Sequence, residues 1–135
     1  MTKLEEFLKI YHISETLEGA EILENFSLNE IDTIYNGIGS DEFPDWLREL
    51  VTISAGLFEP AALIHDLDYY IGGDWEKFKV DNDRFERNCK KLVKRKYGWY
   101  NPVRYLWLNK ARRWANYCRI FGWSAYNHRG EYHGN

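Results

Sequence analysis

The chain has 135 residues, enough for a single domain with a modest hydrophobic core. Hydrophobic residues make up 44% of it, charged residues 29% and aromatic residues 17%, with only 3 prolines, which excludes a disordered chain. The net charge of −3 hides an uneven distribution, because residues 1–89 carry 7 Lys and Arg against 20 Asp and Glu, whereas residues 90–135 carry 11 against 1.

Cysteine content and hydropathy indicate the compartment. Cys89 and Cys118 are the chain's two cysteines, too few for a disulfide-framed secreted miniprotein. The longest charge-free runs, such as Leu50–Phe58, fall far short of the ~20 apolar residues that a membrane span requires. Residues 1–10 are charged and amphipathic, unlike a signal peptide. We therefore expect a cytoplasmic protein without a transmembrane segment.

The first third of the chain predicts short helices. Apolar residues at three- and four-residue spacing over residues 4–11 predict an amphipathic helix within an N-terminal helical extension, residues 1–27. Ser27 and Glu30 form a capping box that opens a second helix. That helix is expected to stop at Tyr35-Asn36-Gly37-Ile38-Gly39, where two glycines favour a turn.

Prolines and glycines then divide the middle of the chain. Pro44 is placed to begin a short helix through residues 46–50, and Pro60 to begin another over residues 61–71. Gly72-Gly73 ends that helix, and Asp74 is a good N-cap for a long helix from Trp75 to about Tyr97. Two long helices joined by so tight a turn predict an antiparallel hairpin.

Asn101-Pro102 repeats the start signal, and the last helix is expected to end near Phe121. Its apolar stripe comprises Trp107, Ala111, Trp114, Cys118 and Phe121. Residues 122–135 lack a helical pattern and are expected to form an irregular tail. No segment alternates convincingly as a strand, with brief pairing over residues 50–57 as the one alternative. The predicted fold is a small, single, all-α domain.

The densest cluster of functional groups surrounds His65, with Asp66 beside it and Tyr69 one helical turn on. An imidazole next to a carboxylate on a rigid helix suits general-base catalysis or metal binding, although an isolated His-Asp pair is more often part of a solvated helix face. Equal distances from the glycine turn place residues 81–83 opposite His65. The hairpin therefore supplies a partner that could orient the imidazole.

The apolar stripe of the long helix narrows the choice of partner. Asp81 and Asn82 both face inward with Phe78 and Phe85, so either could orient His65. Asp83 falls off this stripe and is expected to pair with Arg87 in solvent.

The glycine loop, residues 35–39, is a second candidate site. Glycines allow backbone carbonyls to turn inward, and a ring of carbonyls with a carboxylate suits Ca²⁺. A plain turn is the alternative for so short a motif, and the absence of a third glycine and a preceding strand argues against a dinucleotide site.

Together these segments resemble phospholipase A₂, closest to its disulfide-free viral, phage and bacterial forms. That family combines a Tyr-x-Gly-x-Gly calcium loop, a helix with the motif Cys-Cys-x-x-His-Asp-x-Cys-Tyr, and an antiparallel helix that supplies an Asp to the His. The resemblance covers residues 35–40, 60–71 and 75–92. Ala61, Ala62 and Asp68 replace the cysteines of the motif, and about ten extra residues separate the loop from the His.

The resemblance implies a set of roles. His65 is the general base that activates water for attack on an ester carbonyl, Asp81 or Asn82 orients it, and Tyr69 holds the orienting side chain. The family's spacing favours Asn82. Calcium is bound by the Asp66 carboxylate and by three backbone carbonyls, those of Tyr35, Gly37 and Gly39.

The basic segment from residue 90 onward also contains four tryptophans: Trp99, Trp107, Trp114 and Trp123. Cations beside interfacial aromatic residues suit an anionic membrane surface. The same residues suit single-stranded nucleic acid, which we rank last because no second motif supports it. Burial of Trp107 and Trp114, and pairing of the arginines with the acidic half, is the structural alternative.

These observations favour calcium-dependent hydrolysis of phospholipid or related esters. The alternative is a catalytically silent phospholipase A₂-like module that binds a membrane or a protein, and a plain helical interaction protein is the third. Contact of Asp81 with His65 would favour the enzyme, and contact of Asn82 with His65 would favour the silent module.

Overall fold

The computed structural model describes residues 2–35 and 45–127, with side chains in the second range from residue 56 onward. The described residues form helices and contain no strand, which confirms the all-α prediction. Residues 50–57 are helical, so the alternative of a brief strand there is wrong. No described helix is long and apolar enough to cross a membrane.

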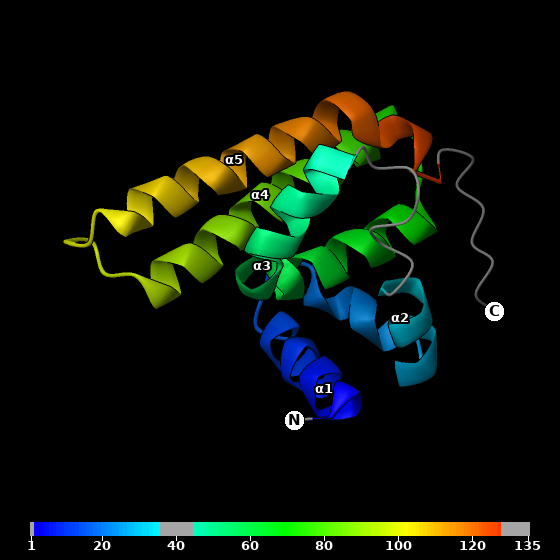
Figure 1. The fold of residues 1–135 in the computed structure, drawn as a ribbon. Helices are drawn as coiled ribbons and strands as arrows, with labels where there is room; N and C mark the ends of the chain where they lie inside the picture. The colour runs from blue at the N-terminus through cyan, green and yellow to red at the C-terminus, as the bar shows by residue number, and fades with distance from the viewer. Residues whose placement is uncertain (1, 36–44, 128–135) are drawn as a thin grey trace.

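The N-terminal part comprises α1 (Lys3–Ser14), the 3₁₀ helix η1 (Ala20–Asn25) and α2 (Leu28–Tyr35). The predicted capping box at α2 is confirmed: Ser27 N donates to Glu30 Oε1 at 2.9 Å, and Glu30 N donates to Ser27 Oγ at 3.1 Å. Both α1 and α2 pack against α3, on the side away from α5 (Figure 1).

Helix α3 (Asp45–Ile71) differs from the prediction, because it continues through Pro60 instead of restarting there. A proline inside a helix removes one backbone hydrogen bond and commonly bends the axis. Figure 1 shows this bend between the first part of α3 and the part that runs beside α4. The bent helix stays continuous because the residues around the proline lie in the core: Phe58, Ala61, Leu63, Ile64 and Leu67.

Helices α4 (Trp75–Lys96) and α5 (Val103–Phe121) begin and end close to where the sequence predicts. The predicted stripe of α4 is buried, since Phe78, Phe85, Cys89 and Leu92 all belong to the core. The stripe of α5 is only partly correct, because Ala111 is buried but Phe121 is 59% exposed. Trp107 and Trp114 are half-buried and pack edge-on against Phe58, with ring centroids 5.7 and 5.9 Å away.

The predicted irregular tail needs a correction over the part that the structure describes. Residues Gly122–Ser124 form the 3₁₀ helix η2, and Tyr126 is only 2% exposed. Tyr126 packs edge-on against Tyr69, 4.9 Å between ring centroids, so aromatic packing rather than helical periodicity orders this segment. Residues 128–135 lie outside the described residues.

Candidate functional site

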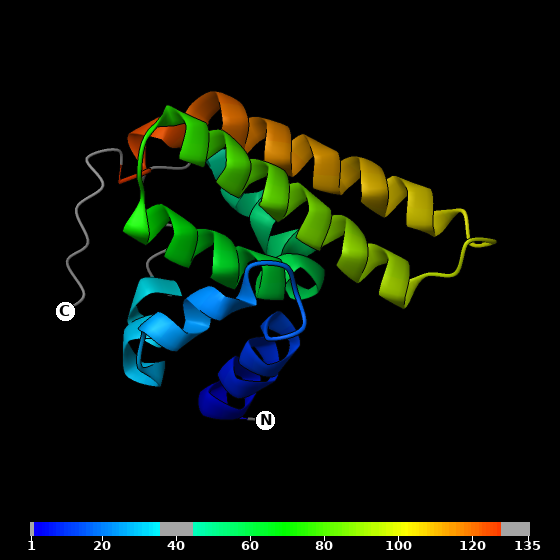
Figure 2. The same ribbon diagram turned by 180° about the vertical axis from the view of Figure 1, so that it is seen from behind.

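The turn between α3 and α4 sets the register of the candidate site. Gly72 and Gly73 adopt φ values of +70° and +150°, which residues with a side chain rarely adopt. Asp74 then caps α4, its Oδ1 accepting from Lys77 N at 2.9 Å. The chain thus reverses over three residues, and the second half of α3 packs alongside α4 as predicted (Figure 2).

His65 of α3 bonds to Asn82 of α4 across this hairpin. The distance between His65 Nε2 and Asn82 Oδ1 is 2.8 Å, and Tyr69 donates its hydroxyl to the same oxygen at 2.8 Å. An amide oxygen carries no hydrogen, so Nε2 must be the donor and the imidazole proton lies there. In this tautomer the lone pair of Nδ1 takes no part in the bond to Asn82. Nδ1 could therefore accept a proton as a general base.

The structure decides between the two partners that the sequence left open. Asp81, the predicted alternative, does not bond His65: its Oδ2 accepts from Tyr126 Oη at 2.6 Å and from Lys77 Nζ at 2.8 Å. Its carboxylate affects His65 only through its charge, which raises the pKa of the imidazole. Asp81 therefore holds the C-terminal segment, and Asn82 orients the histidine.

Burial controls the charge of His65. The side chain is 7% exposed, and its ring stacks on Phe85 with centroids 4.3 Å apart. Desolvation lowers the pKa of His65 to about 4, against the smaller raising effects of Asn82 and Asp81. The imidazole is therefore neutral near pH 7, with its lone pair available.

The Asn82 amide is only half satisfied. It is completely buried, yet its Nδ2 has no hydrogen-bond partner among the described residues. A buried donor without a partner costs about 1–3 kcal/mol. A carboxylate at this position would accept the same two hydrogen bonds and leave no donor unpaired.

Asp66, next to His65, has an oxygen with unused capacity. Its Oδ2 is buried and accepts no hydrogen bond from the described residues. Desolvation raises the pKa of this carboxyl well above its usual value, because nothing described compensates its charge. A bound cation would provide that compensation, so Asp66 fits the predicted role of a metal ligand.

The remaining predicted calcium ligands are only partly described. Tyr35 ends α2, and the charges of Asp66 and Glu59 raise the pKa of its hydroxyl, in addition to the larger effect of burial. Tyr35 is the last described residue before the two glycines of the loop. Gly37 and Gly39 lie outside the described residues, and the described ones hold no cluster of three His, Cys, Asp or Glu that could bind a metal.

Two features around the site escaped the sequence analysis. Tyr126 reaches the site from a segment without any helical pattern, so only the aromatic composition hinted at its burial. Gly122 lies so close to Tyr69 that a Cβ there would stand 2.3 Å from the hydroxyl oxygen. The glycine therefore allows the C-terminal segment to cover Tyr69.

The predicted Asp83–Arg87 pair is wrong. Asp83 Oδ1 accepts from Arg119 Nη2 of α5 at 2.8 Å, and Arg87 donates its Nε to Glu18 Oε2 at 2.9 Å. Both residues are exposed, as predicted, but each finds a partner on another segment. The partner of Asp83 lies on α5, and the partner of Arg87 lies in the connection between α1 and η1.

Comparisons with protein-family models, curated proteins and solved structures found no match to this chain. The resemblance to phospholipase A₂ therefore stays a prediction from the residues quoted above.

Proposed function

We propose that the chain hydrolyses phospholipid or related ester bonds in a calcium-dependent reaction with His65 as the general base. The observation that supports this proposal is a neutral imidazole, with its proton on Nε2, beside a buried carboxylate. The contact of His65 with Asn82 rather than Asp81 is the outcome that favours the second candidate given below. The unpaired Asp66 oxygen beside it supports a cation at the same place.

The chemistry follows from these groups. His65 Nδ1 takes a proton from a water molecule as the water oxygen attacks the ester carbonyl, and the imidazolium then returns that proton to the departing alkoxide. Asn82 accepts from Nε2–H throughout, so the ring keeps its orientation while its charge changes. Tyr69 fixes the amide oxygen in turn.

Asp66 is the described residue that would hold the calcium, with the carbonyls of Tyr35, Gly37 and Gly39 as the ligands implied by the resemblance. When bound, the ion would polarise the ester carbonyl and stabilise the oxyanion that forms on attack. Burial raises the pKa of the Asp66 carboxyl well above its usual value.

The second candidate is a catalytically silent module that binds a membrane surface or a protein partner. The observation that favours it is the identity of the orienting residue: the Asn82 amide stabilises an imidazolium less than a carboxylate would, and the low pKa of about 4 makes His65 a weak base. We place either form in the cytoplasm, because Cys89 and Cys118 are both free thiols. Either form could contact a membrane surface peripherally.

Hydrolysis of a water-soluble ester and of phospholipid vesicles, each with millimolar Ca²⁺ or with a chelator, tests the proposal. We expect the chelator to abolish turnover and His65→Gln to reduce it by at least about a hundredfold. His12→Gln is the matched control, because His12 is an exposed histidine on α1. If His65→Gln abolishes turnover but the chelator does not, the calcium step is excluded. If the wild type shows no turnover at all, the silent module is the remaining candidate.

A further inference from the structure

Helices α4 and α5 extend together beyond the rest of the molecule, and the turn that joins them lies at the far end (Figures 1 and 2). This turn has a defined conformation. Asn101 N donates to Gly98 O at 3.0 Å, and Tyr105 Oη donates to Trp99 O at 2.9 Å. Two hydrogen bonds therefore hold the backbone of this turn.

The turn and the start of α5 present apolar side chains to solvent. Trp99 is 75% exposed, Tyr100 76% and Leu106 66%, and Val103, one turn before Leu106, is 38% exposed. We call these four residues the tip. Clustered apolar side chains on a rigid surface usually mark an interaction site.

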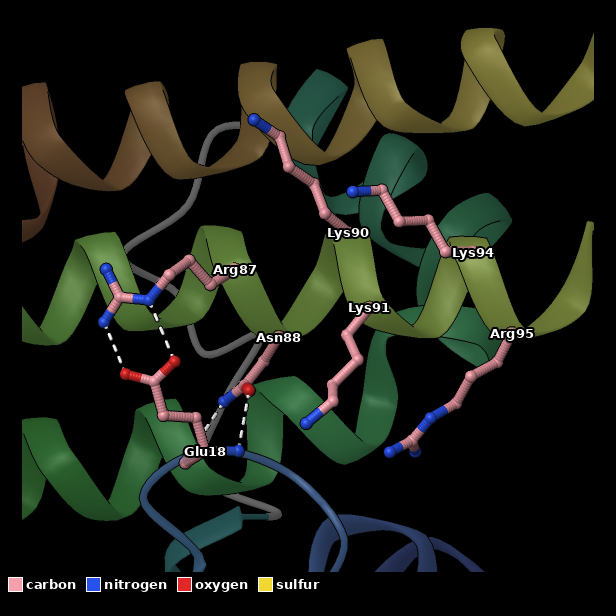
Figure 3. A pocket seen from close by; sticks show the side chains of 7 residues that line it. All are labelled: Glu18, Arg87, Asn88, Lys90, Lys91, Lys94 and Arg95. Carbon is pink, nitrogen blue, oxygen red and sulfur yellow. Dashed lines mark hydrogen bonds and ion pairs between the residues drawn. The ribbon is translucent and has the colours of Figure 1, made fainter. Parts of the chain in front are cut away.

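Positive charge surrounds the tip. Residues 90–113 contain nine Lys and Arg and no Asp or Glu. Four of these cations, Lys90, Lys91, Lys94 and Arg95, line a groove of about 570 Å³ along α4 together with Glu18, Arg87 and Asn88. Lys91 and Arg95 point toward the α1–η1 connection, and Lys90 and Lys94 point toward α5 (Figure 3). Arg87 in this groove is paired with Glu18, and Lys90 with Glu86. Lys91 and Lys94 are exposed, and neither forms a direct ion pair with a described residue, although the charge of Lys91 contributes to lowering the pKa of Glu18.

We propose that the tip docks on an anionic phospholipid membrane, with its aromatic rings at the headgroup level and with Lys91 and Lys94 on lipid phosphates. Tryptophan and tyrosine favour this interfacial depth, and lysines next to it add electrostatic attraction. Leu106 and Val103 distinguish this partner from nucleic acid, because aliphatic side chains suit acyl chains and offer no stacking surface for bases.

This proposal deepens the second candidate function and is independent of hydrolysis. Asn82 lies about four turns before the end of α4, roughly 20 Å from the tip at the rise of an α-helix. Substitutions at the tip should therefore leave the surroundings of His65, and any turnover of a soluble ester, unchanged.

Vesicle flotation tests the proposal, with phosphatidylcholine alone and with phosphatidylglycerol at about a third of the lipid. We expect binding only to the anionic vesicles, and weaker binding at high salt. Trp99→Ala combined with Leu106→Ala should weaken it at least about tenfold. Lys91→Gln combined with Lys94→Gln should weaken it about fivefold per lysine.

Matched controls lie on the same helices. Ile120, at the other end of α5, is 69% exposed, so Ile120→Ala should leave binding unchanged. Lys79→Gln serves likewise on α4, near its start. Equal binding to neutral vesicles, or full binding by the tip variants, would overturn the proposal. Tighter binding to a single-stranded oligonucleotide, lost in the same variants, would overturn it in favour of nucleic acid.

Discussion

Aromatic and polar side chains are buried near the start of α4 and exposed near its end. Near its start, His65, Asn82 and Phe85 are buried, and the polar atoms bond one another across the hairpin. Beyond its end, Trp99 and Tyr100 are exposed, and Lys91 and Lys94 in its last two turns form no ion pair with a described residue. The buried hydrogen bonds of the first region fix the position of an imidazole. The exposed aromatic and basic side chains of the second region can contact a binding partner.

Because one region is buried and the other exposed, we expect the two to respond independently to mutation. Burial couples the hairpin site to folding, so changes there affect stability and chemistry together. Exposure uncouples the tip, so changes there should affect binding alone.

The largest expected effect is on stability. Phe85→Ala removes a ring that is 4% exposed and stacks on His65, and should lower the free energy of unfolding by about 3–5 kcal/mol. Trp99→Ala removes a larger ring that is 75% exposed, and should change it by less than about 0.5 kcal/mol. Urea denaturation measures both values, and comparable losses in the two variants would contradict the separation.

The next effect is a pH dependence specific to the hairpin. The pKa of His65 is about 4 in the folded chain against an ordinary 6.5, so the unfolded chain takes up this proton first on acidification. Stability from this residue is complete above pH 6.5 and declines as the pH falls towards 4. His65→Gln removes this effect. As the pH falls from 7 to 4, the free energy of unfolding of the variant should therefore rise by about 3 kcal/mol relative to that of the wild type.

Asp66 and Asp68 act in the opposite direction, because burial raises the pKa of each carboxyl, that of Asp68 to about 7. Both carboxyls are present in the wild type and in His65→Gln, so their contribution largely cancels in the comparison. Denaturation at a series of pH values gives the difference. His12→Gln should show less than about 1 kcal/mol of relative change, and an equal gain in that control would exclude burial as the cause.

The smallest effect concerns the orienting residue. Asn82→Asp replaces an amide whose Nδ2 is unpaired with a carboxylate that accepts the same two hydrogen bonds. The negative charge raises the pKa of His65 and should increase ester turnover roughly tenfold, with its acid limb shifted to higher pH. NMR can follow the titration of His65 in the variant. If the pKa of His65 shifts but turnover stays unchanged, the result would support the silent module.

Much of the fold was predictable because it depends on local signals. The capping box at Ser27, the N-cap at Asp74 and the glycines of the hairpin turn act within a few residues of one another. Pro60 misled the prediction because its local effect, to begin a helix, was outweighed by burial of the apolar residues around it. The pairing of Asp83 with Arg119 could not be predicted, since it depends on where α5 crosses α4.

The amino-acid sequence was enough to give the uneven charge of the two halves, the bounds of most helices, and the position of His65 opposite residues 81–83. The tertiary structure was needed to show that Asn82, and not Asp81, bonds His65. It also shows that Tyr126 donates a hydrogen bond to Asp81 instead. The reason is geometric. Adjacent residues on a helix point about 100° apart, so which one meets a side chain on the next helix depends on how the two helices rotate against each other as the core packs.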